Sequence, residues 1–168
     1  MRITFLVAAL IVSLGCDTSD RIARLEKENQ ELQAQIKKND AAADYDLQAK
    51  CGGDARAWFN ENWGSRDKDT ILLDFSNHYN KKMNKCFIVV EYHYNSHLVG
   101  DGGNSWTNDM VVSDVYENVK YGTFAENNYS YWKPTITTRS EVITCELYGQ
   151  KCKTLQEFNQ LLYPYINN

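Results

Sequence analysis

Three residues with metal-binding side chains lie close together in the middle of the chain. Glu91, His93 and His97 are separated by even numbers of residues within a segment rich in β-branched and aromatic residues, so a β-strand would place all three on one face. Imidazole and carboxylate groups are ligands that transition metals accept. The spacing predicts a candidate metal site and, with it, a metal-dependent enzyme. The simpler alternative is that strand alternation places these polar residues on the face in contact with water.

No other motif in the sequence indicates catalysis. Ser105 lies outside any Gly-x-Ser-x-Gly nucleophile elbow. The glycine-rich run at residues 100–103 matches neither the phosphate-binding loop nor the dinucleotide-binding fingerprint. We therefore expect a protein that is not an enzyme and that requires no cofactor.

Aromatic residues interleaved with asparagines form a candidate platform for a glycan or a peptide. Aromatic side chains offer rigid contact area at a small entropic cost. The alternative is that a small sheet uses these large side chains to fill its core. The four candidates for the platform are Trp106, Tyr129, Tyr131 and Trp132.

The charge balance argues against a nucleic-acid partner. The chain has 168 residues, with 18 lysines and arginines against 22 aspartates and glutamates, which gives a net charge of −4. There is no basic excess to neutralise a phosphate backbone, so we expect no binding to nucleic acid. The length corresponds to one folded domain with appendages.

The N-terminal residues have the composition of an export signal. Met1-Arg2 supplies a positive charge, an apolar segment follows at residues 3–12, and the small residue Gly15 precedes Cys16. The segment Ser13-Leu14-Gly15-Cys16 resembles the lipobox of a bacterial lipoprotein precursor, with a serine at its first position where leucine is usual.

This resemblance implies that residues 1–15 are a signal peptide that is removed from the mature protein. It also implies a diacylglycerol on the Cys16 sulfur and a fatty acid on the new terminal amine. Stable anchoring takes at least two acyl chains, so three would hold the protein on a membrane. We expect a lipoprotein of the bacterial cell envelope, at the inner or outer membrane, with its folded domain outside the cytoplasm.

Residues 16–43 are expected to contain the lipid attachment site and a helical stalk. Good helix formers dominate residues 17–43, which include no aromatic residue, glycine or proline. The large apolar residues follow a heptad pattern with one asparagine, a residue that favours a parallel two-stranded coiled coil. The pattern is shorter than a firm assignment needs, so a parallel homodimer through residues 22–36 and a solvated spacer both stand as interpretations. The heptad positions are Ile22, Leu25, Asn29, Leu32 and Ile36.

Residues 44–168 hold all four tryptophans and all eleven tyrosines, so the hydrophobic core is expected there. Helical spacing predicts a helix at residues 44–62, and a capping box at Thr154 predicts a second helix that ends near Pro164. We predict an α+β domain in which helices pack on one face of an antiparallel sheet. The predicted strands are residues 71–75, 86–94, 110–116, 120–126 and 140–147, and the predicted inward face of the second strand is Cys86, Ile88, Val90, Tyr92 and Tyr94.

The four cysteines of the domain predict two disulfides in an exported protein. Of the three pairings, we favour Cys145 with Cys152, because Tyr148-Gly149 between them suits a hairpin, which leaves Cys51 with Cys86. A zinc site or a redox pair is disfavoured because the sequence contains no Cys-x-x-Cys. The domain is therefore expected to be stapled by disulfides.

Two short motifs and the last cysteines resemble a group of small exported bacterial proteins of unassigned function. The motifs are Asn77-His78-Tyr79-Asn80 and Asn84-Lys85-Cys86-Phe87, followed by Cys145 and residues 152–158. The resemblance covers roughly residues 51–166. It implies the boundaries of the domain and transfers no catalytic residue.

These observations predict a membrane-anchored envelope lipoprotein whose domain is a non-enzymatic binding module for an envelope protein or glycan. The alternative has the same anchor but acts as a periplasm-facing inhibitor, immunity or exclusion factor that blocks an incoming enzyme or phage component. Its acidic charge would favour docking to a basic partner. The third hypothesis is the metal-dependent enzyme at Glu91, His93 and His97.

Overall fold

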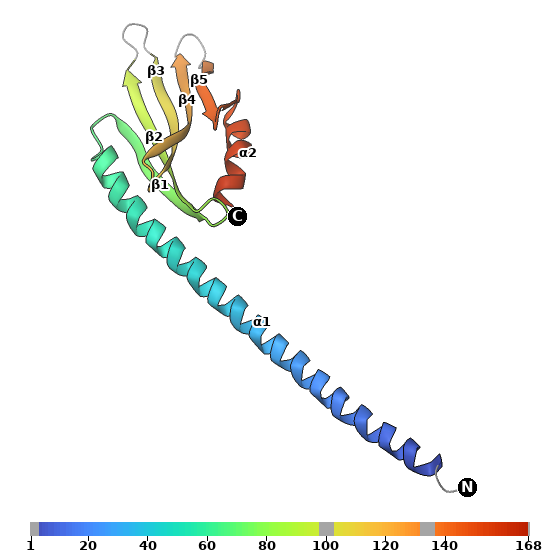
Figure 1. The fold of residues 1–168 in the computed structure, drawn as a ribbon. Coiled ribbons are helices and arrows are strands. Elements are labelled where there is room, and N and C mark those ends of the chain that lie inside the picture. Colours follow the sequence, from blue (N-terminus) through green and yellow to red (C-terminus); the bar gives the residue numbers. More distant parts are fainter. Residues whose placement is uncertain (1–3, 98–102, 132–136, 168) are drawn as a thin grey trace. The chain divides into compact units, whose positions relative to one another are not determined.

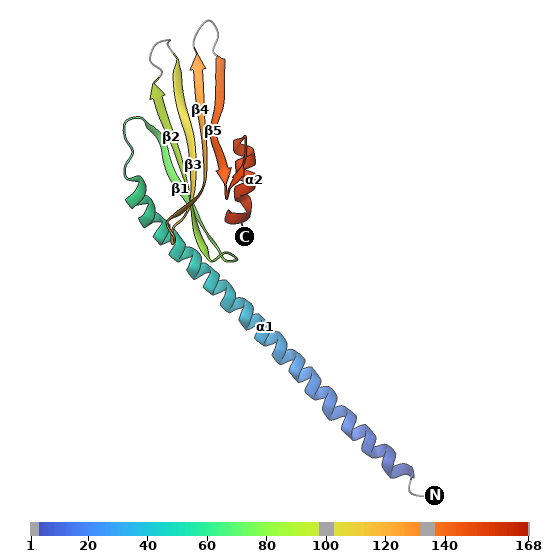
Figure 2. The same cartoon turned by 45° about the horizontal axis from the view of Figure 1, so that its top comes forward.

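The computed structural model describes residues 4–97, 103–131 and 137–167, and for residues 4–17, 96 and 97 it describes the backbone alone. In these residues a long helix is followed by a sheet and a C-terminal helix (Figure 1 and Figure 2). The elements are α1 (Thr4–Trp63), β1 (Thr70–Asn80), β2 (Lys85–His97), β3 (Asn104–Asp114), β4 (Val119–Tyr131), β5 (Thr137–Leu147), β6 (Gln150–Lys151) and α2 (Leu155–Ile166).

The chain divides into two compact units, Met1–Tyr45 and Asp46–Asn168, and α1 contributes to both. Over its described residues, the first unit is helix alone. Every residue from 18 to 43 is exposed, and Lys27 Nζ lies 4.0 Å from Glu31 Oε1 one turn further along. The helix predicted for the stalk is therefore present.

The last part of α1 is the helix predicted at the start of the domain. It passes through Gly52 and Gly53 without interruption. A Cβ atom at Gly52 would lie 3.7 Å from Asn77 Nδ2, whereas a Cβ atom at Gly53 would meet nothing within 4 Å. The first glycine therefore lies at a close approach between α1 and β1.

The strands form one antiparallel sheet, in the order β1-β2-β3-β4-β5-β6, so each strand pairs with the next in sequence. The predicted hairpin is β1 and β2. Asn84 and Asn118 adopt left-handed backbone conformations, with φ of 53° each, next to two of the turns. The turn between β5 and β6 is Tyr148-Gly149, with φ of 50° and 75°. The predicted α+β class is confirmed. The strands are longer than the apolar segments that predicted them, although β3 ends at Asp114, two residues before its predicted end.

The two helices cover opposite faces of the sheet, which corrects the prediction that both pack on one face. On one face, α1 packs through Cys51 and Ala55 against β1 and β2. On the other, α2 packs through Phe158 and Leu162 against β2 to β5. In β2 both parities are buried, because the apolar run is uninterrupted. Cys86, Ile88 and Val90 belong to the α1 face, and Phe87 and Val89 belong to the α2 face.

Both predicted disulfides are present. Cys51–Cys86 joins α1 to β2 with its Cα atoms 5.5 Å apart, and Cys145–Cys152 closes the β5–β6 hairpin with its Cα atoms 5.0 Å apart. In the loop-entropy model, the longer loop contributes about 4 kcal/mol and the shorter one about 2 kcal/mol to stability. The first disulfide therefore carries the larger share.

The two outer edges of the sheet differ in how their backbone groups are satisfied. Along β1, Leu73 O accepts from Arg66 Nη2 at 3.0 Å, Phe75 N donates to Asp74 Oδ1 at 2.8 Å, and Tyr79 N donates to Gln48 Oε1 at 2.8 Å. These bonds occupy three backbone groups with which a further strand could otherwise pair. At the opposite edge, β6 pairs with Glu146 and Leu147 alone.

Substitution of Gly122 tests the close packing between β4 and β5. A Cβ atom there would overlap Leu147 Cδ1 and would lie 2.7 Å from the Glu146 carbonyl oxygen, which is backbone and has little freedom to move. We expect Gly122→Ala to lower the free energy of unfolding by about 1–3 kcal/mol. The matched control, Gly53→Ala, places its methyl group in open space on a helix and is expected to raise stability by up to about 1 kcal/mol. Urea unfolding followed by tryptophan fluorescence measures both. Equal stability of the two variants would contradict this account.

Candidate functional site

Hydrogen bonds and a disulfide fix the start of α2 beside the sheet. Thr154 Oγ1 accepts from Glu157 N at 3.1 Å, and Glu157 Oε2 accepts from Lys153 N at 2.7 Å. This confirms Thr154 as the N-cap, whereas the Glu157 side chain binds the N–H of the residue before the cap and not that of Thr154 itself. Cys152, which precedes this turn, is bonded to Cys145 in β5. The first turn of α2 is thus held in place over the sheet.

A cavity of about 270 Å³ lies between the start of α2 and the sheet face that α2 covers. The strand register places Met110 opposite Glu91 on one side and Phe124 on the other, and it pairs His93 with Asn108. The cavity therefore joins an apolar surface to a carboxylate, an imidazole and amides. Its lining residues are Glu91, His93, Asn108, Met110, Phe124, Leu155 and Asn159.

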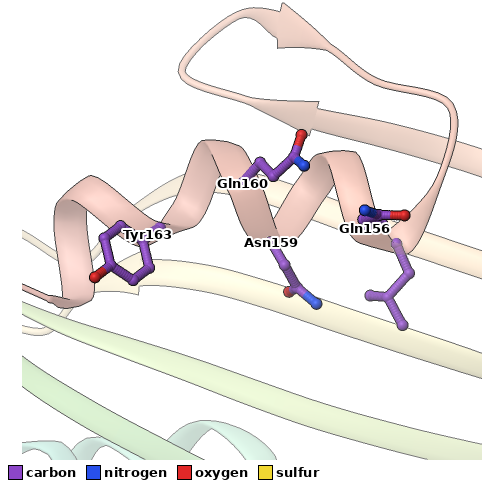
Figure 3. Close-up of a pocket in the computed structure, with 5 residues that line it drawn as sticks. Gln156, Asn159, Gln160 and Tyr163 are labelled. Atoms are coloured by element: carbon purple, nitrogen blue, oxygen red, sulfur yellow. The ribbon is translucent and has the colours of Figure 1, made fainter.

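A second, more open hollow of about 670 Å³ follows α2 and shares Leu155 and Asn159 with the first. Figure 3 shows the side chains that line it, with Asn159 and Gln160 projecting in opposite directions from the helix. Its two large apolar side chains face water, since Leu155 is 41% exposed and Tyr163 is 64% exposed. The second hollow is lined by Leu155, Gln156, Asn159, Gln160 and Tyr163. We call the two hollows together the α2 groove.

The α2 groove brings together two of the three predicted metal ligands. Glu91 and His93 both line it, as their shared strand parity predicts. His97 is the last residue of β2, and its side chain lies outside the described part of the structure. Among the side chains that the structure describes, no group of three or more histidines, cysteines, aspartates or glutamates is placed to hold a metal ion. The side chains that line the groove offer hydrogen-bonding groups and apolar contact surface.

The predicted aromatic platform is divided between the two faces of the sheet, which corrects the prediction of a single surface. Trp106 pairs with Asn95 and Asn128, so it shares the α2 face. Tyr129 pairs with Ser105 and therefore lies on the α1 face, where it stacks on Tyr131 with ring centroids 6.4 Å apart. Trp132 lies outside the described residues.

Aromatic residues outside the predicted platform share the face of Tyr129. Tyr92 stacks on Tyr94 with centroids 6.0 Å apart, and Trp63 of α1 lies 6.1 Å from Tyr92. The sequence predicts that Tyr92 and Tyr94 face inward, but both are only partly buried, and Tyr92 packs at the margin of the core on the α1 face. The alternation of residues along β2 predicts that Tyr92 and Tyr94 share a face. It does not predict that Tyr129 of β4 lies on that same face, because this depends on the strand register.

A polar cluster around Lys85 also went unpredicted. Lys85 Nζ donates to Asp114 Oδ2 at 2.9 Å, to Glu117 Oε2 at 2.5 Å and to Tyr121 OH at 2.8 Å. The hydrogen bond to Glu117, followed by the one to Tyr121, holds the pKa of Lys85 above its ordinary value. A nucleophilic lysine needs a lowered pKa. Lys85 therefore serves as a fixed cation that neutralises the fully buried Asp114.

Three stacked tyrosines border this cluster. The ring centroids of Tyr121 and Tyr148 lie 4.4 Å apart, and those of Tyr148 and Tyr165 lie 4.5 Å apart. Burial raises the pKa of the Tyr148 hydroxyl, so this phenol stays protonated at neutral pH. The stack joins β4, the β5–β6 turn and α2, and its role is to hold the C-terminal part of α2 on the sheet.

Comparison with known proteins gives no relative on which to base an assignment. No protein-family model matches the chain, and neither the curated proteins nor the solved structures include one that matches it significantly. Within the described part of the chain, no helix has both the length and the apolar character that crossing a bilayer requires.

Loss of the Lys85 charge tests the structural role of its cluster. We expect Lys85→Met to lower the free energy of unfolding by about 3 kcal/mol, because it leaves the Asp114 carboxylate buried without a counter-ion. Lys50 is the matched control, since it also pairs with an aspartate, Asp54, but its side chain is 63% exposed. Lys50→Met is expected to cost less than about 1 kcal/mol. Urea unfolding of both variants at neutral pH measures the difference, and similar losses would show that Lys85 does not act through Asp114.

Proposed function

We propose that the protein is a membrane-anchored lipoprotein of the bacterial cell envelope whose disulfide-stapled domain is a non-enzymatic binding module. The observation that most supports this proposal is the distribution of the cysteines. The four in the domain form two disulfides, and the fifth, Cys16, stands directly after the signal-like segment. Structural disulfides are typical of proteins that fold outside the cytosol, which supports export. A cysteine at that position supports attachment of lipid.

The α2 groove is the binding surface in this proposal. Leu155 and Tyr163 offer exposed apolar contact, and Met110 and Phe124 give the cavity an apolar floor. Ligand sites commonly combine an apolar surface with a few polar groups that set orientation. Asn108 and Asn159 can both donate and accept hydrogen bonds, which suits peptide groups. The groove therefore fits a segment of a partner protein that inserts an aliphatic side chain.

The occupied backbone groups of β1 argue against strand addition at that edge as the mode of binding. A partner strand at that edge would have to displace the hydrogen bonds of Arg66, Asp74 and Gln48. Each displaced bond would need to be replaced by an equivalent one, so strand addition at β1 gains little. The α2 groove requires no such exchange.

Substitution of Cys16 tests the anchor. In bacteria that express the full chain, we expect the wild type to partition into the detergent phase with an intact mass that lacks residues 1–15 and includes acyl groups. Cys16→Ser is expected to carry no lipid, to keep its disulfides and to show unchanged near-ultraviolet circular dichroism. Thr18→Ser, two residues away, is a control that leaves the thiol in place. A wild-type mass without lipid, with residue 1 retained, would overturn the anchor.

A photo-reactive amino acid in the groove tests the binding surface. Placed at Asn159 in cells, benzoylphenylalanine is expected to capture one discrete envelope protein. Placed at Glu141, which the β4–β5 register assigns to the other face of the sheet, it is expected to capture none. Leu155→Glu is expected to abolish the adduct at Asn159 without breaking α2, because an acidic residue in the first turn favours the helix dipole.

Three results of this experiment are decisive. An adduct that persists in Leu155→Glu, or one that forms equally from Glu141, would contradict binding in the α2 groove. No discrete adduct from Asn159 would contradict it as well. Capture of a foreign enzyme or phage component would instead support the inhibitor, immunity or exclusion function.

A further inference from the structure

Four large aliphatic side chains in the first unit lie open to water along one helix. Ile22 is 57% exposed, Leu25 59%, Leu32 49% and Ile36 58%. Over its described residues, the Met1–Tyr45 unit consists of α1 alone, so the unit has no second element to cover them. Apolar side chains that gather on one face of an exposed helix indicate a surface that another molecule covers.

The helix places these side chains on a single stripe. Their positions, with Asn29, follow the alternating spacing of three and four residues that defines the a and d positions of a coiled coil. Ile22, Asn29 and Ile36 occupy a positions, and Leu25 and Leu32 occupy d positions. The backbone is helical throughout this segment, so the stripe is continuous.

Asn29 distinguishes between the two orientations in which such helices can pair. In a parallel, in-register pair, each Asn29 faces the Asn29 of the other copy, and the two amides can hydrogen-bond. In an antiparallel pair, a positions face d positions, so Asn29 faces Leu25 or Leu32. That arrangement would bury an amide without a partner, which is costly. The asparagine therefore favours the parallel pair.

The charges beside the stripe agree with that orientation. Arg21 precedes the first a position and Glu26 follows the first d position, so in a parallel pair Arg21 of one copy lies beside Glu26 of the other. The next pairs in the same scheme, Glu28 with Gln33 and Gln35 with Asp40, join no like charges. Charge complementarity therefore indicates a second copy of the same chain as the partner.

We propose that residues 21–36 of two copies pair as a parallel, in-register coiled coil, so that the protein is a homodimer through its N-terminal helix. The seam is short, and the dimer is correspondingly weak in dilute solution and strengthened where copies are concentrated. The pairing follows from the helix itself and does not rest on the α2 groove. Its enhancement by attachment to a common membrane rests on the proposed function.

Oxidative cross-linking of single cysteines tests the pairing. The full chain is used with Cys16→Ser, so that the introduced cysteine is the one free thiol and a failure of the acyl anchor cannot affect the result. Leu25→Cys and Leu32→Cys are each expected to give a disulfide-linked dimer. Ala34→Cys and Lys27→Cys lie on the opposite side of the helix and are expected to give at least about tenfold less. Equal yields at all four positions, or no dimer at Leu25 and Leu32, would overturn the proposal.

Mixed cross-links test the orientation. When differently tagged copies are combined, Leu25→Cys with Ile36→Cys, or Ile22→Cys with Leu32→Cys, is expected to give no heterodimer, because a parallel pair keeps these positions far apart. A heterodimer at either pair would show antiparallel pairing. In the background of Asn29→Leu, we expect such mixed cross-links to become detectable, because the antiparallel arrangement no longer buries an unpaired amide.

Discussion

Burial of β2 on both faces is the constraint on which the rest of the domain depends. From Cys86 to Val90 each side chain is almost fully buried, with alternate residues packed against α1 and α2. The core beneath α1 and the core beneath α2 share no helix residue. Among the buried residues, β2 is the element that contributes to both cores. The Cys51–Cys86 disulfide fastens one side of that arrangement covalently. The Thr154 N-cap and the Cys145–Cys152 disulfide fix α2 on the other side.

The same strand supplies the candidate site because its burial stops abruptly. Val90 is 1% exposed, and the next residue, Glu91, is exposed. On the α2 face, the core of Phe87 and Val89 therefore gives way to Glu91 and His93, which line the cavity beside Leu155 and Asn159. The cavity of the α2 groove therefore lies where the buried part of β2 ends and the start of α2 faces the sheet.

Local signals in the sequence were sufficient for several features and insufficient for others. The Tyr148-Gly149 turn predicted the Cys145–Cys152 pair, and Thr154 with Glu157 predicted the start of α2, because both depend on neighbouring residues. For β2 the sequence predicts one inward face, and the burial of Phe87 and Val89 on the other face corrects this. The uninterrupted apolar run was the signal for burial on both sides, since strands buried on both sides lack alternation. The contact of Lys85 with Asp114 and the separation of Trp106 from Tyr129 depend on strand register. A one-residue shift in register reverses which face a side chain occupies, so these contacts depend on how strands distant in sequence align.

The two proposals concern different units of the chain, and together they describe how modest interactions gain strength. A short coiled coil and a shallow groove are each weak when isolated. If two copies pair through residues 21–36, a partner that presents two sites meets both grooves on one assembly, and the second contact forms at a high effective concentration. Pairing of the helices brings the two grooves together because each domain is covalently joined to its own helix. This effect requires no particular placement of one unit against the other. In this scheme, the exposed Leu155 and Tyr163 need supply only part of the affinity that a single isolated groove would have to provide.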